Sequence, residues 1–229
     1  MPADEQESVL ATRVQFVLYD GFDPLDVVAP FEVLAAGSAM LGGALELVLV
    51  SAEGPRQVPS GTRGISLEAT AGLDPAIAGY VVVPGAVGPV DGDPDAGDVT
   101  IPVILGRFAA SPAMELMGRA LADPRVTVAT QCGGSLPLAM AGLIEGRYAT
   151  THVLGLDLLG ATGVNAVRAR VVDDGDLVSA GGVTSGLDLG LYLLERDFGP
   201  RVAHAVEELF EYERRGVTWR NAGAAPAAA

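Results

Sequence analysis

The hydrophobic positions of this chain form short β-branched runs that alternate with longer stretches of helical periodicity. Short apolar runs bounded by Gly, Pro and Asp are typical of buried strands, whereas one face of a helix repeats about every three to four residues. Strands are predicted over residues 13–19, 45–51, 64–69, 80–84, 126–130 and 148–152, with a hairpin formed by 169–172 and 177–180. Helices are predicted over residues 27–34, 112–121, 135–140, 153–159, 187–196 and 202–214. This alternation predicts an α/β fold, in which helices sandwich a mostly parallel sheet.

The stretch from Val126 to Met140 joins a buried strand to a helix through Cys132-Gly133-Gly134. The two glycines permit a sharp turn because they have no Cβ atom. Such an elbow lifts the Cys132 sulfur out of the sheet and places it at a helix N-terminus, where the helix dipole favours the reactive thiolate. Cys132 is therefore a candidate nucleophile, although a lone cysteine is by default a small buried hydrophobe.

Other turn residues follow predicted strands in the same way as Cys132. Asp26, Gly85 and Gly182 each lie just beyond a strand, and ligands of parallel sheets collect at the carboxyl ends of the strands. We therefore expect a site where these segments converge. The Gly85-Ala86 end could present backbone donors to a ligand, although a tight turn explains it equally well.

Asp26 has a second interpretation as a helix-start residue. It precedes the apolar residues of the first predicted helix, in which Pro30 fits the first turn and Gly37 is a typical stop. The residues alone leave both interpretations open.

The amino-acid composition adds little to the prediction of the fold. Hydrophobic residues make up 49% of the 229 positions and aromatic residues only 5%, so we expect a mainly aliphatic core. The even spread of apolar segments predicts one domain over residues 13–220, with disordered segments at 1–12 and 221–229.

The net charge of −15 limits the partners that the chain can bind. Nucleic-acid backbones and anionic membrane surfaces would repel it, so we expect neither as a partner and favour a small neutral or cationic substrate. No apolar run approaches the ~20 residues of a membrane span, and the polar N-terminal segment is unlike a signal peptide. A cytoplasmic location is predicted, and the single cysteine, which excludes an intramolecular disulfide, is consistent with a reducing compartment.

The remaining chemistry-bearing residues have simpler interpretations. The acidic segment 91–98 lacks the terminal bidentate Glu of a calcium loop and is expected to be a solvated surface loop. His152 follows a predicted strand and could line a pocket, but a lone His near a helix start is more often structural. Neither His152 nor His204 has metal-ligand spacing to Cys132, so no metal site is predicted. Ser185 is more simply a helix cap than a nucleophile.

Five motifs together resemble the DJ-1/PfpI superfamily, and within it the isocyanide hydratase branch. They are residues 16–30, 83–85, 130–135, 149–152 and 181–188. The resemblance implies a flavodoxin-like fold related to class I glutamine amidotransferases, a nucleophile elbow at Cys132, an acid at Asp26 close to the sulfur, and a homodimer. Protease-like and glyoxalase-like members carry His where this chain has Gly133, and hydratase relatives often have Thr there.

On this resemblance the chain is expected to be a lyase that needs no cofactor and hydrates an isocyanide to an N-substituted formamide. Cys132 would form a thioimidate, with Asp26 as general acid and base. The expected backbone donors are Gly85, Ala86 and Gly133, and the expected pocket residues are Phe22, Leu25, Thr151, His152 and Val183.

Two alternatives stay open. One is another cysteine enzyme of the superfamily, glyoxalase-like and acting on reactive carbonyls. The other is a non-catalytic redox sensor or ligand-binding protein, because an activated thiolate is also what oxidation selects. Transcription regulators of the superfamily carry an added helix-turn-helix domain, for which the residues after Trp219 are too few, so a stand-alone enzyme is expected.

Overall fold

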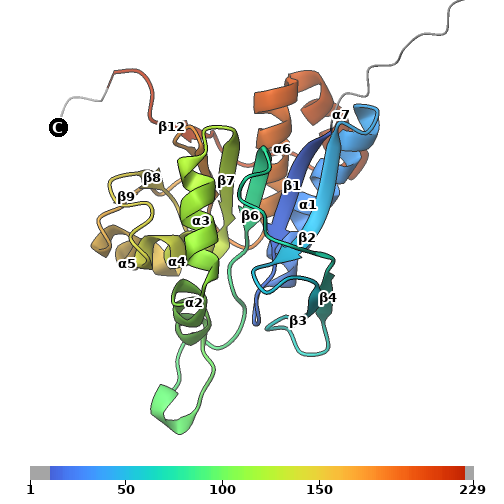
Figure 1. The fold of residues 1–229 in the computed structure, drawn as a ribbon. Helices are drawn as coiled ribbons and strands as arrows, with labels where there is room; N and C mark the ends of the chain where they lie inside the picture. The colour runs from blue at the N-terminus through green and yellow to red at the C-terminus, as the bar shows by residue number, and fades with distance from the viewer. Residues whose placement is uncertain (1–10, 225–229) are drawn as a thin grey trace, which may run out of the picture.

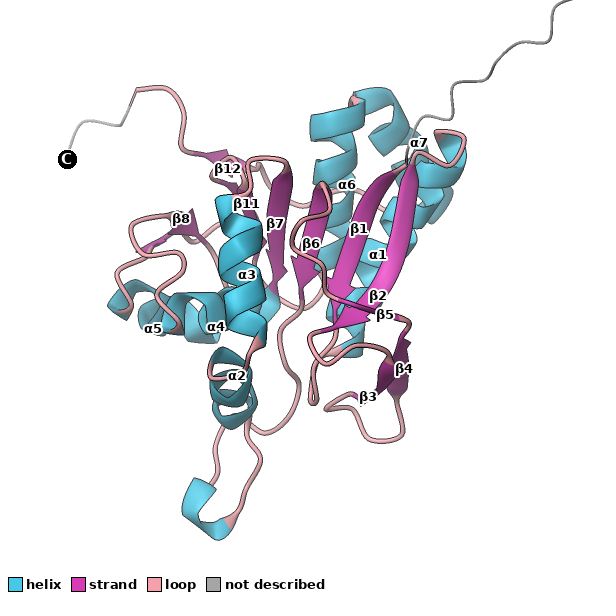
Figure 2. Ribbon diagram, in the orientation of Figure 1, coloured by secondary structure: helices cyan, strands magenta, loops and turns pink. Residues whose placement is uncertain are grey.

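A computed structural model describes residues 11–224 and has one eight-stranded sheet between layers of helices (Figures 1 and 2). The order of the strands is β12-β10-β11-β7-β6-β1-β2-β5, and only the β10–β11 pair is antiparallel. The strands are β1 (Thr12–Val17), β2 (Leu45–Ser51), β5 (Ala71–Gly72), β6 (Gly79–Val83), β7 (Val126–Gln131), β10 (Val171–Asp173), β11 (Leu177–Ala180) and β12 (Trp219–Arg220). The predicted α/β fold with a mostly parallel sheet is confirmed.

Two groups of helices cover the sheet. Helices α1 (Pro24–Met40), α6 (Ser185–Phe198) and α7 (Pro200–Phe210) pack against one another on one face, and α3 (Ala113–Ala122) lies on the other (Figure 1). The helices α2 (Ile101–Ala109), α4 (Ser135–Met140) and α5 (Leu156–Ala161) gather beyond the carboxyl end of β7. Short 3₁₀ turns are η1 (Pro94–Ala96), η2 (Cys132–Gly134) and η3 (Val153–Gly155), and small strand pairs are β3 (Arg56–Pro59) with β4 (Ser66–Ala69) and β8 (Tyr148–Ala149) with β9 (Asn165–Ala166).

The central strands are buried on both faces, as their continuous apolar runs predict. Val14 and Phe16 of β1, Val81 and Val83 of β6 and Val128 of β7 are completely buried. This rigid centre fixes the positions at which the loops leave the carboxyl ends of the strands.

The predicted start and stop of the first helix were wrong. Asp23, not Asp26, caps α1, since its carboxylate accepts the Leu25 N–H at 3.0 Å, and Pro24 occupies the first helical position. Asp26 lies inside the first turn, and the helix continues past Pro30 to Met40. Gly37 does not stop it, because its role is packing: a Cβ there would lie 2.5 Å from Leu194 Cδ2 of α6.

Other predicted elements differ at their ends or were missed. Helix α2 was not predicted, although Thr100 caps it and Pro102 lies in its first turn. The predicted strand over 148–152 is only Tyr148–Ala149, and the last helix ends at Phe210. The acidic segment 91–98 is an exposed loop, as predicted.

The predicted terminal disorder concerns mostly residues 1–10 and 225–229, which lie outside the described range, while Thr12 already belongs to β1. The domain limits stay a prediction. Over residues 11–224, no helix has the length and apolar character needed to cross a bilayer.

Candidate active site

Cys132 lies at a sharp turn between β7 and α4. Its φ angle of 52° is in the left-handed region, which is strained for a residue with a side chain. Two glycines allow the turn to touch the end of β6. A Cβ on Gly134 would lie 2.3 Å from the Val83 carbonyl oxygen, and one on Gly85 would lie 2.6 Å from the Gly133 nitrogen. The predicted elbow is therefore a close contact of two backbone segments that only glycine permits.

Buried hydrogen bonds hold this strained turn in place. The Cys132 carbonyl accepts from the Thr151 hydroxyl at 2.8 Å and from the His152 N–H at 3.1 Å. Below it, the hydroxyls of Thr130 and Ser135 are 2.6 Å apart, and Ser135 in turn donates to a backbone carbonyl. These polar residues position the sulfur, because a buried network with all its partners is rigid.

Asp26 brings a carboxyl group to the same place from the first turn of α1. Its side chain is completely buried. One oxygen, Oδ2, accepts the Gly85 N–H at 2.9 Å, and the other, Oδ1, has no hydrogen-bond partner among residues 11–224. A buried carboxylate oxygen without a donor is costly, whereas a protonated one carries its own hydrogen.

The surroundings of Asp26 favour its neutral form. Burial, and then the charge of Asp23, raise the pKa of Asp26 to about 8, while the Gly85 N–H and the nearby Gln131 and Cys132 side chains oppose the rise. Asp26 is therefore protonated at neutral pH and can act as an acid.

The thiol does not have the lowered pKa that the elbow predicts. Burial and the charge of Asp26 raise the pKa of Cys132 well above its ordinary value, and the Gly133 N–H lowers it only in part. The helix that follows is only six residues long, so its dipole does not outweigh the desolvation of Cys132, a residue that is only 6% exposed. Cys132 and Asp26 therefore share their protons as a coupled pair.

Asp23 is a site residue that the sequence analysis missed. It lines the same cavity as Cys132, and its charge raises the pKa of both Cys132 and Asp26. Burial raises the pKa of Asp23 itself. The signal in the sequence is the Asp23-Pro24 pair, because Asp is a common helix cap and Pro is common at the first helical position.

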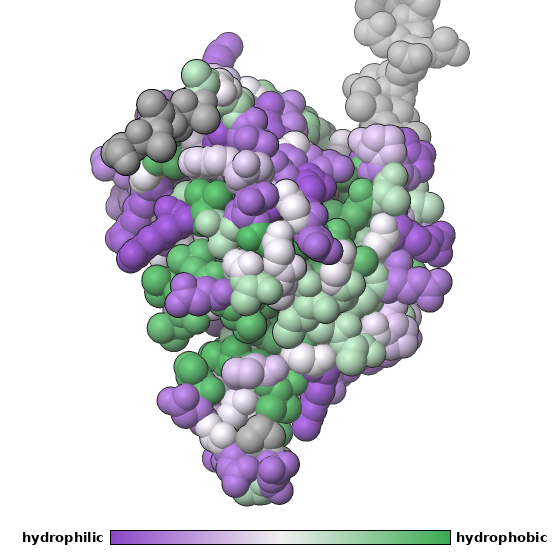
Figure 3. Space-filling view, turned by 90° about the vertical axis from the view of Figure 1, so that its left-hand side faces the viewer, coloured by the Kyte–Doolittle hydropathy of each residue, from purple (hydrophilic) through white to green (hydrophobic). Residues whose placement is uncertain are grey.

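A largely apolar cavity of about 350 Å³ opens beside the sulfur. Its polar lining residues are Asp23, Cys132 and His152. Its apolar walls come from the loop after β6 and from α2, α4 and α5, and hydrophobic residues gather on this face of the molecule (Figure 3). The cavity has room on the order of a dozen heavy atoms, if each takes about the 30 Å³ of a water molecule.

The structure brings some of the predicted donor and pocket residues to this cavity but not others. Ala86, Gly133, His152 and Val183 line it. The Nδ1 atom of His152 accepts the Leu154 N–H at 3.3 Å, so a neutral ring carries its proton on Nε2.

The other predicted pocket and donor residues have different roles. Phe22 is completely buried behind the site, Leu25 is 44% exposed outside it, and Thr151 holds the Cys132 carbonyl. The Gly85 N–H donates to Asp26 at 2.9 Å, and its predicted role as a backbone donor at the site stays a prediction. Nothing in the described residues groups three metal-ligating side chains.

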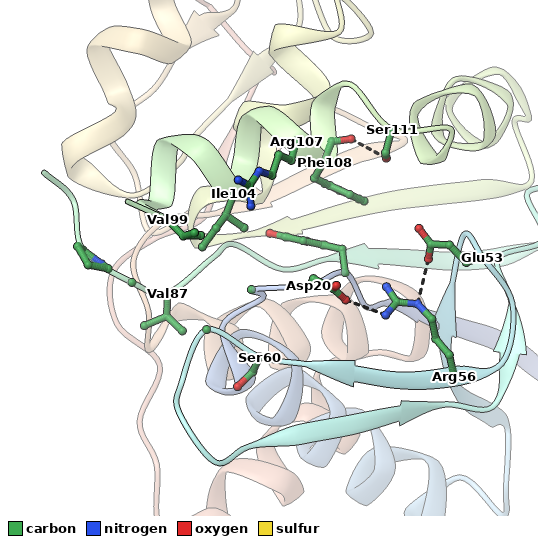
Figure 4. A pocket seen from close by; sticks show the side chains of 15 residues that line it. Asp20, Glu53, Arg56, Ser60, Val87, Val99, Ile104, Arg107, Phe108 and Ser111 are labelled. Carbon is green, nitrogen blue, oxygen red and sulfur yellow. Dashed lines mark hydrogen bonds and ion pairs between the residues drawn. The ribbon is translucent and has the colours of Figure 1, made fainter. Parts of the chain in front are cut away.

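A second and more open cleft of about 510 Å³ lies on the other side of α2 (Figure 4). Its charged residue Arg56 is bound to Asp20 at 2.7 Å and to Glu53 at 3.3 Å. The hydroxyls of Ser60 and Ser111 donate to backbone carbonyls. Arg107 also lines this cleft, but the single cysteine of the chain lies in the smaller cavity, so the larger cleft offers no comparable nucleophile.

Comparisons with known proteins show which families and structures the chain is similar to. The family model described as DJ-1/PfpI matches residues 105–196. Isonitrile hydratase of Pseudomonas putida is 32% identical over 207 residues, which are 89% of this chain and 79% of that enzyme. The HTH-type transcriptional regulator CdhR of Pseudomonas aeruginosa is 26% identical over 85% of this chain and 53% of the regulator. The crystal structure of a THiJ/PfpI family protein from Pseudomonas syringae is similar in fold, with a TM-score of 0.71, 23% identity and coverage of 94% of this chain and 83% of that one.

Proposed function

The chain belongs to the DJ-1/PfpI family, and we propose that within this family it is an isocyanide hydratase, a lyase that adds water to the terminal carbon of an isocyanide and releases an N-substituted formamide. The isonitrile hydratase of Pseudomonas putida, to which most of the chain aligns, supports this assignment.

One observation carries the proposal. A completely buried carboxyl group with a raised pKa lies beside a cysteine sulfur at the end of an apolar cavity. An isocyanide carbon accepts a nucleophile and a proton at the same atom, so its hydration needs a soft nucleophile and an acid side by side. Cys132 and Asp26 would meet that requirement.

In the first half-reaction the Cys132 thiolate attacks the terminal carbon, and Asp26 transfers its proton to the same carbon. The product is a thioimidate, with a new carbon–sulfur bond and a new carbon–hydrogen bond, and Asp26 becomes a carboxylate. In the second half, Asp26 takes a proton from water as the water oxygen attacks the thioimidate carbon, and this proton passes to the substrate nitrogen. The tetrahedral species then breaks its carbon–sulfur bond, its hydroxyl proton returns to Asp26, and the formamide leaves.

Backbone groups supplement this pair. The Gly133 N–H favours the thiolate of Cys132, and Ala86 lines the same cavity. In the proposal these two positions face the charge that develops during attack, while the Gly85 N–H orients Asp26. The scheme uses no metal and no cofactor, and the enzyme is expected to be a homodimer.

The test is direct. Purified protein is mixed with cyclohexyl or phenyl isocyanide, and formation of the matching formamide is followed by NMR, with Cys132→Ala in parallel. We expect product from the wild type and none above the buffer rate from the variant. Formamide formation by Cys132→Ala at the wild-type rate would exclude the mechanism.

Absence of product from every isocyanide would leave the alternatives. A carbonyl-directed enzyme would form lactate from methylglyoxal, although Gly133 stands where such relatives carry His. A redox sensor would react with peroxide without turnover, but the raised pKa of the Cys132 thiol disfavours the thiolate that attacks peroxide.

A further inference from the structure

The mouth of the active-site cavity is ringed by exposed apolar side chains, which we call the apolar collar. Its members are Val90, Met140, Leu154 and Leu158, and all four line the cavity. Their exposed fractions are 51%, 40%, 72% and 50%. Scattered exposed apolar residues are ordinary, but a contiguous group around a cavity marks a binding surface.

The collar is assembled from separate parts of the chain. Val90 lies in the loop that leaves β6, Met140 ends α4, Leu154 is in η3 and Leu158 is in α5. Figure 3 shows hydrophobic residues on both sides of an indentation on the face that carries α4 and α5. The apolar lining of the cavity therefore continues outward onto the surface, from the sulfur to the rim.

Charge limits what this surface can bind. Asp23 is the carboxylate that lines the cavity, and Asp26 behind it is neutral at neutral pH. The chain as a whole carries a net charge of −15. An anionic ligand would meet repulsion both at the approach and inside, whereas an uncharged apolar ligand meets none.

We propose that the substrate is an isocyanide with an extended, uncharged apolar substituent that runs from Cys132 along the cavity and over the collar. This inference rests on the proposed hydratase function. The isocyano group occupies two heavy atoms, so a cavity on the order of a dozen heavy atoms leaves room for a chain of roughly ten. The far end of such a chain lies against Leu154, which lines the cavity and is the most exposed member of the collar.

The test uses a series of straight-chain isocyanides from n-propyl to n-octyl, with isocyanoacetate as the anionic member. We expect kcat/KM to rise about two- to fourfold with each added methylene, because each one buries apolar surface. Isocyanoacetate should react at least about tenfold more slowly than n-propyl isocyanide, and Asp23→Asn should narrow that gap.

A collar variant and a matched control locate the effect. Leu154→Ser should lower the octyl-to-propyl ratio of kcat/KM by roughly tenfold, which corresponds to about 55 Å² of lost apolar contact. Leu209→Ser changes a leucine of α7 that is 61% exposed and outside the cavity lining, and it should leave the ratio unchanged. A flat series, or an equal effect of both variants, would overturn the inference while the hydratase function stands.

Two further measurements separate the possible failures. Binding of N-propylformamide and N-octylformamide to Cys132→Ala by calorimetry tests chain selectivity without turnover. Tighter octyl binding together with no turnover of any isocyanide would exclude the function and retain the selectivity of the collar.

If light scattering shows that Leu154→Ser dissociates a dimer, a second copy of the chain covers the collar and the inference is wrong.

Discussion

The open cleft and the active-site cavity lie on either side of α2, and they differ in the hydrogen bonds and ion pairs of their polar groups. The open cleft is larger, but Arg56 there is bound to two carboxylates at the surface. The active-site cavity is smaller, and behind its strained cysteine lies the completely buried Asp26, one of whose oxygens has no partner among residues 11–224. A buried polar group without a partner destabilises the folded state, so it persists mainly where chemistry needs it. An exposed ion pair changes the free energy of folding only slightly. Volume alone would therefore have favoured the open cleft over the active-site cavity.

Among substitutions in the cavity and the cleft, Asp26→Asn is expected to have the largest effect on the rate of isocyanide hydration. The amide keeps the shape of the side chain and can still accept the Gly85 N–H, but it cannot transfer a proton. We expect kcat for isocyanide hydration to fall about 10³-fold, as is typical for loss of a general acid and base. Rate measurement on purified variants checks this, and a loss below about tenfold would show that another group moves the proton.

The same variant should be more stable than the wild type. The pKa of Asp26 is raised in the folded state to about 8, so the folded protein binds more protons than the unfolded chain between about pH 4 and 8. Wild-type stability is therefore lost as pH rises through this window, and the free energy of unfolding of Asp26→Asn should exceed that of the wild type by on the order of 5 kcal/mol at pH 8. Urea unfolding at pH 5 and pH 8 measures the difference, which should shrink at the lower pH.

The next effect is the pH dependence of the wild-type enzyme. Cys132 and Asp26 are both protonated in neutral solution, and the reactive pair holds one proton. Because the first proton leaves with a pKa of about 8, kcat/KM should rise roughly fiftyfold from pH 6 to pH 8 and then level off. A rate that falls across this range would assign the reaction to the doubly protonated pair. The rate of alkylation of Cys132 by iodoacetamide gives an independent profile.

Asp23→Asn should produce a smaller change of the same kind. Asn is also a good helix cap, so α1 keeps its N-terminus, while the negative charge that raises the pKa of Asp26 is removed. The pH at which kcat/KM is half-maximal should move to a lower value, and the rate at pH 6.5 should rise several-fold. An unchanged profile with normal thermal stability would show that Asp23 acts only as a cap.

The smallest effect belongs to the open cleft. Arg56→Met removes both ion pairs, yet the partners Asp20 and Glu53 are more than half exposed. We expect the free energy of unfolding to change by less than about 1 kcal/mol and kcat/KM to stay at the wild-type value. A larger loss of activity would show that Arg56 influences the reaction in the cavity. The conclusion that the cleft plays no part in the chemistry would then be wrong.

Much of the fold could be predicted because the local signals agreed with the global structure. The run over 45–51 is β2 as predicted, and the strand-Cys-Gly-Gly-helix order places Cys132 at the elbow. The start of α1 was wrong because both Asp23 and Asp26 precede apolar residues, and only the Leu25 hydrogen bond distinguishes the cap. Gly37 does not stop the helix because α6, far away in the sequence, needs its missing Cβ.

The sequence by itself determined the order of the main strands and helices apart from α2, the elbow, and the meeting of Cys132 with the Asp26 and Gly85 segments at one edge of the sheet. The reason is that periodicity and turn chemistry are local properties, and parallel strands all end on the same side. Only the tertiary structure decided the protonation of Asp26, the raised pKa of the Cys132 thiol, the use of the Gly85 N–H and the existence of the collar. Desolvation and charge act through space, so they depend on which distant segments pack together, and residue spacing does not contain that information.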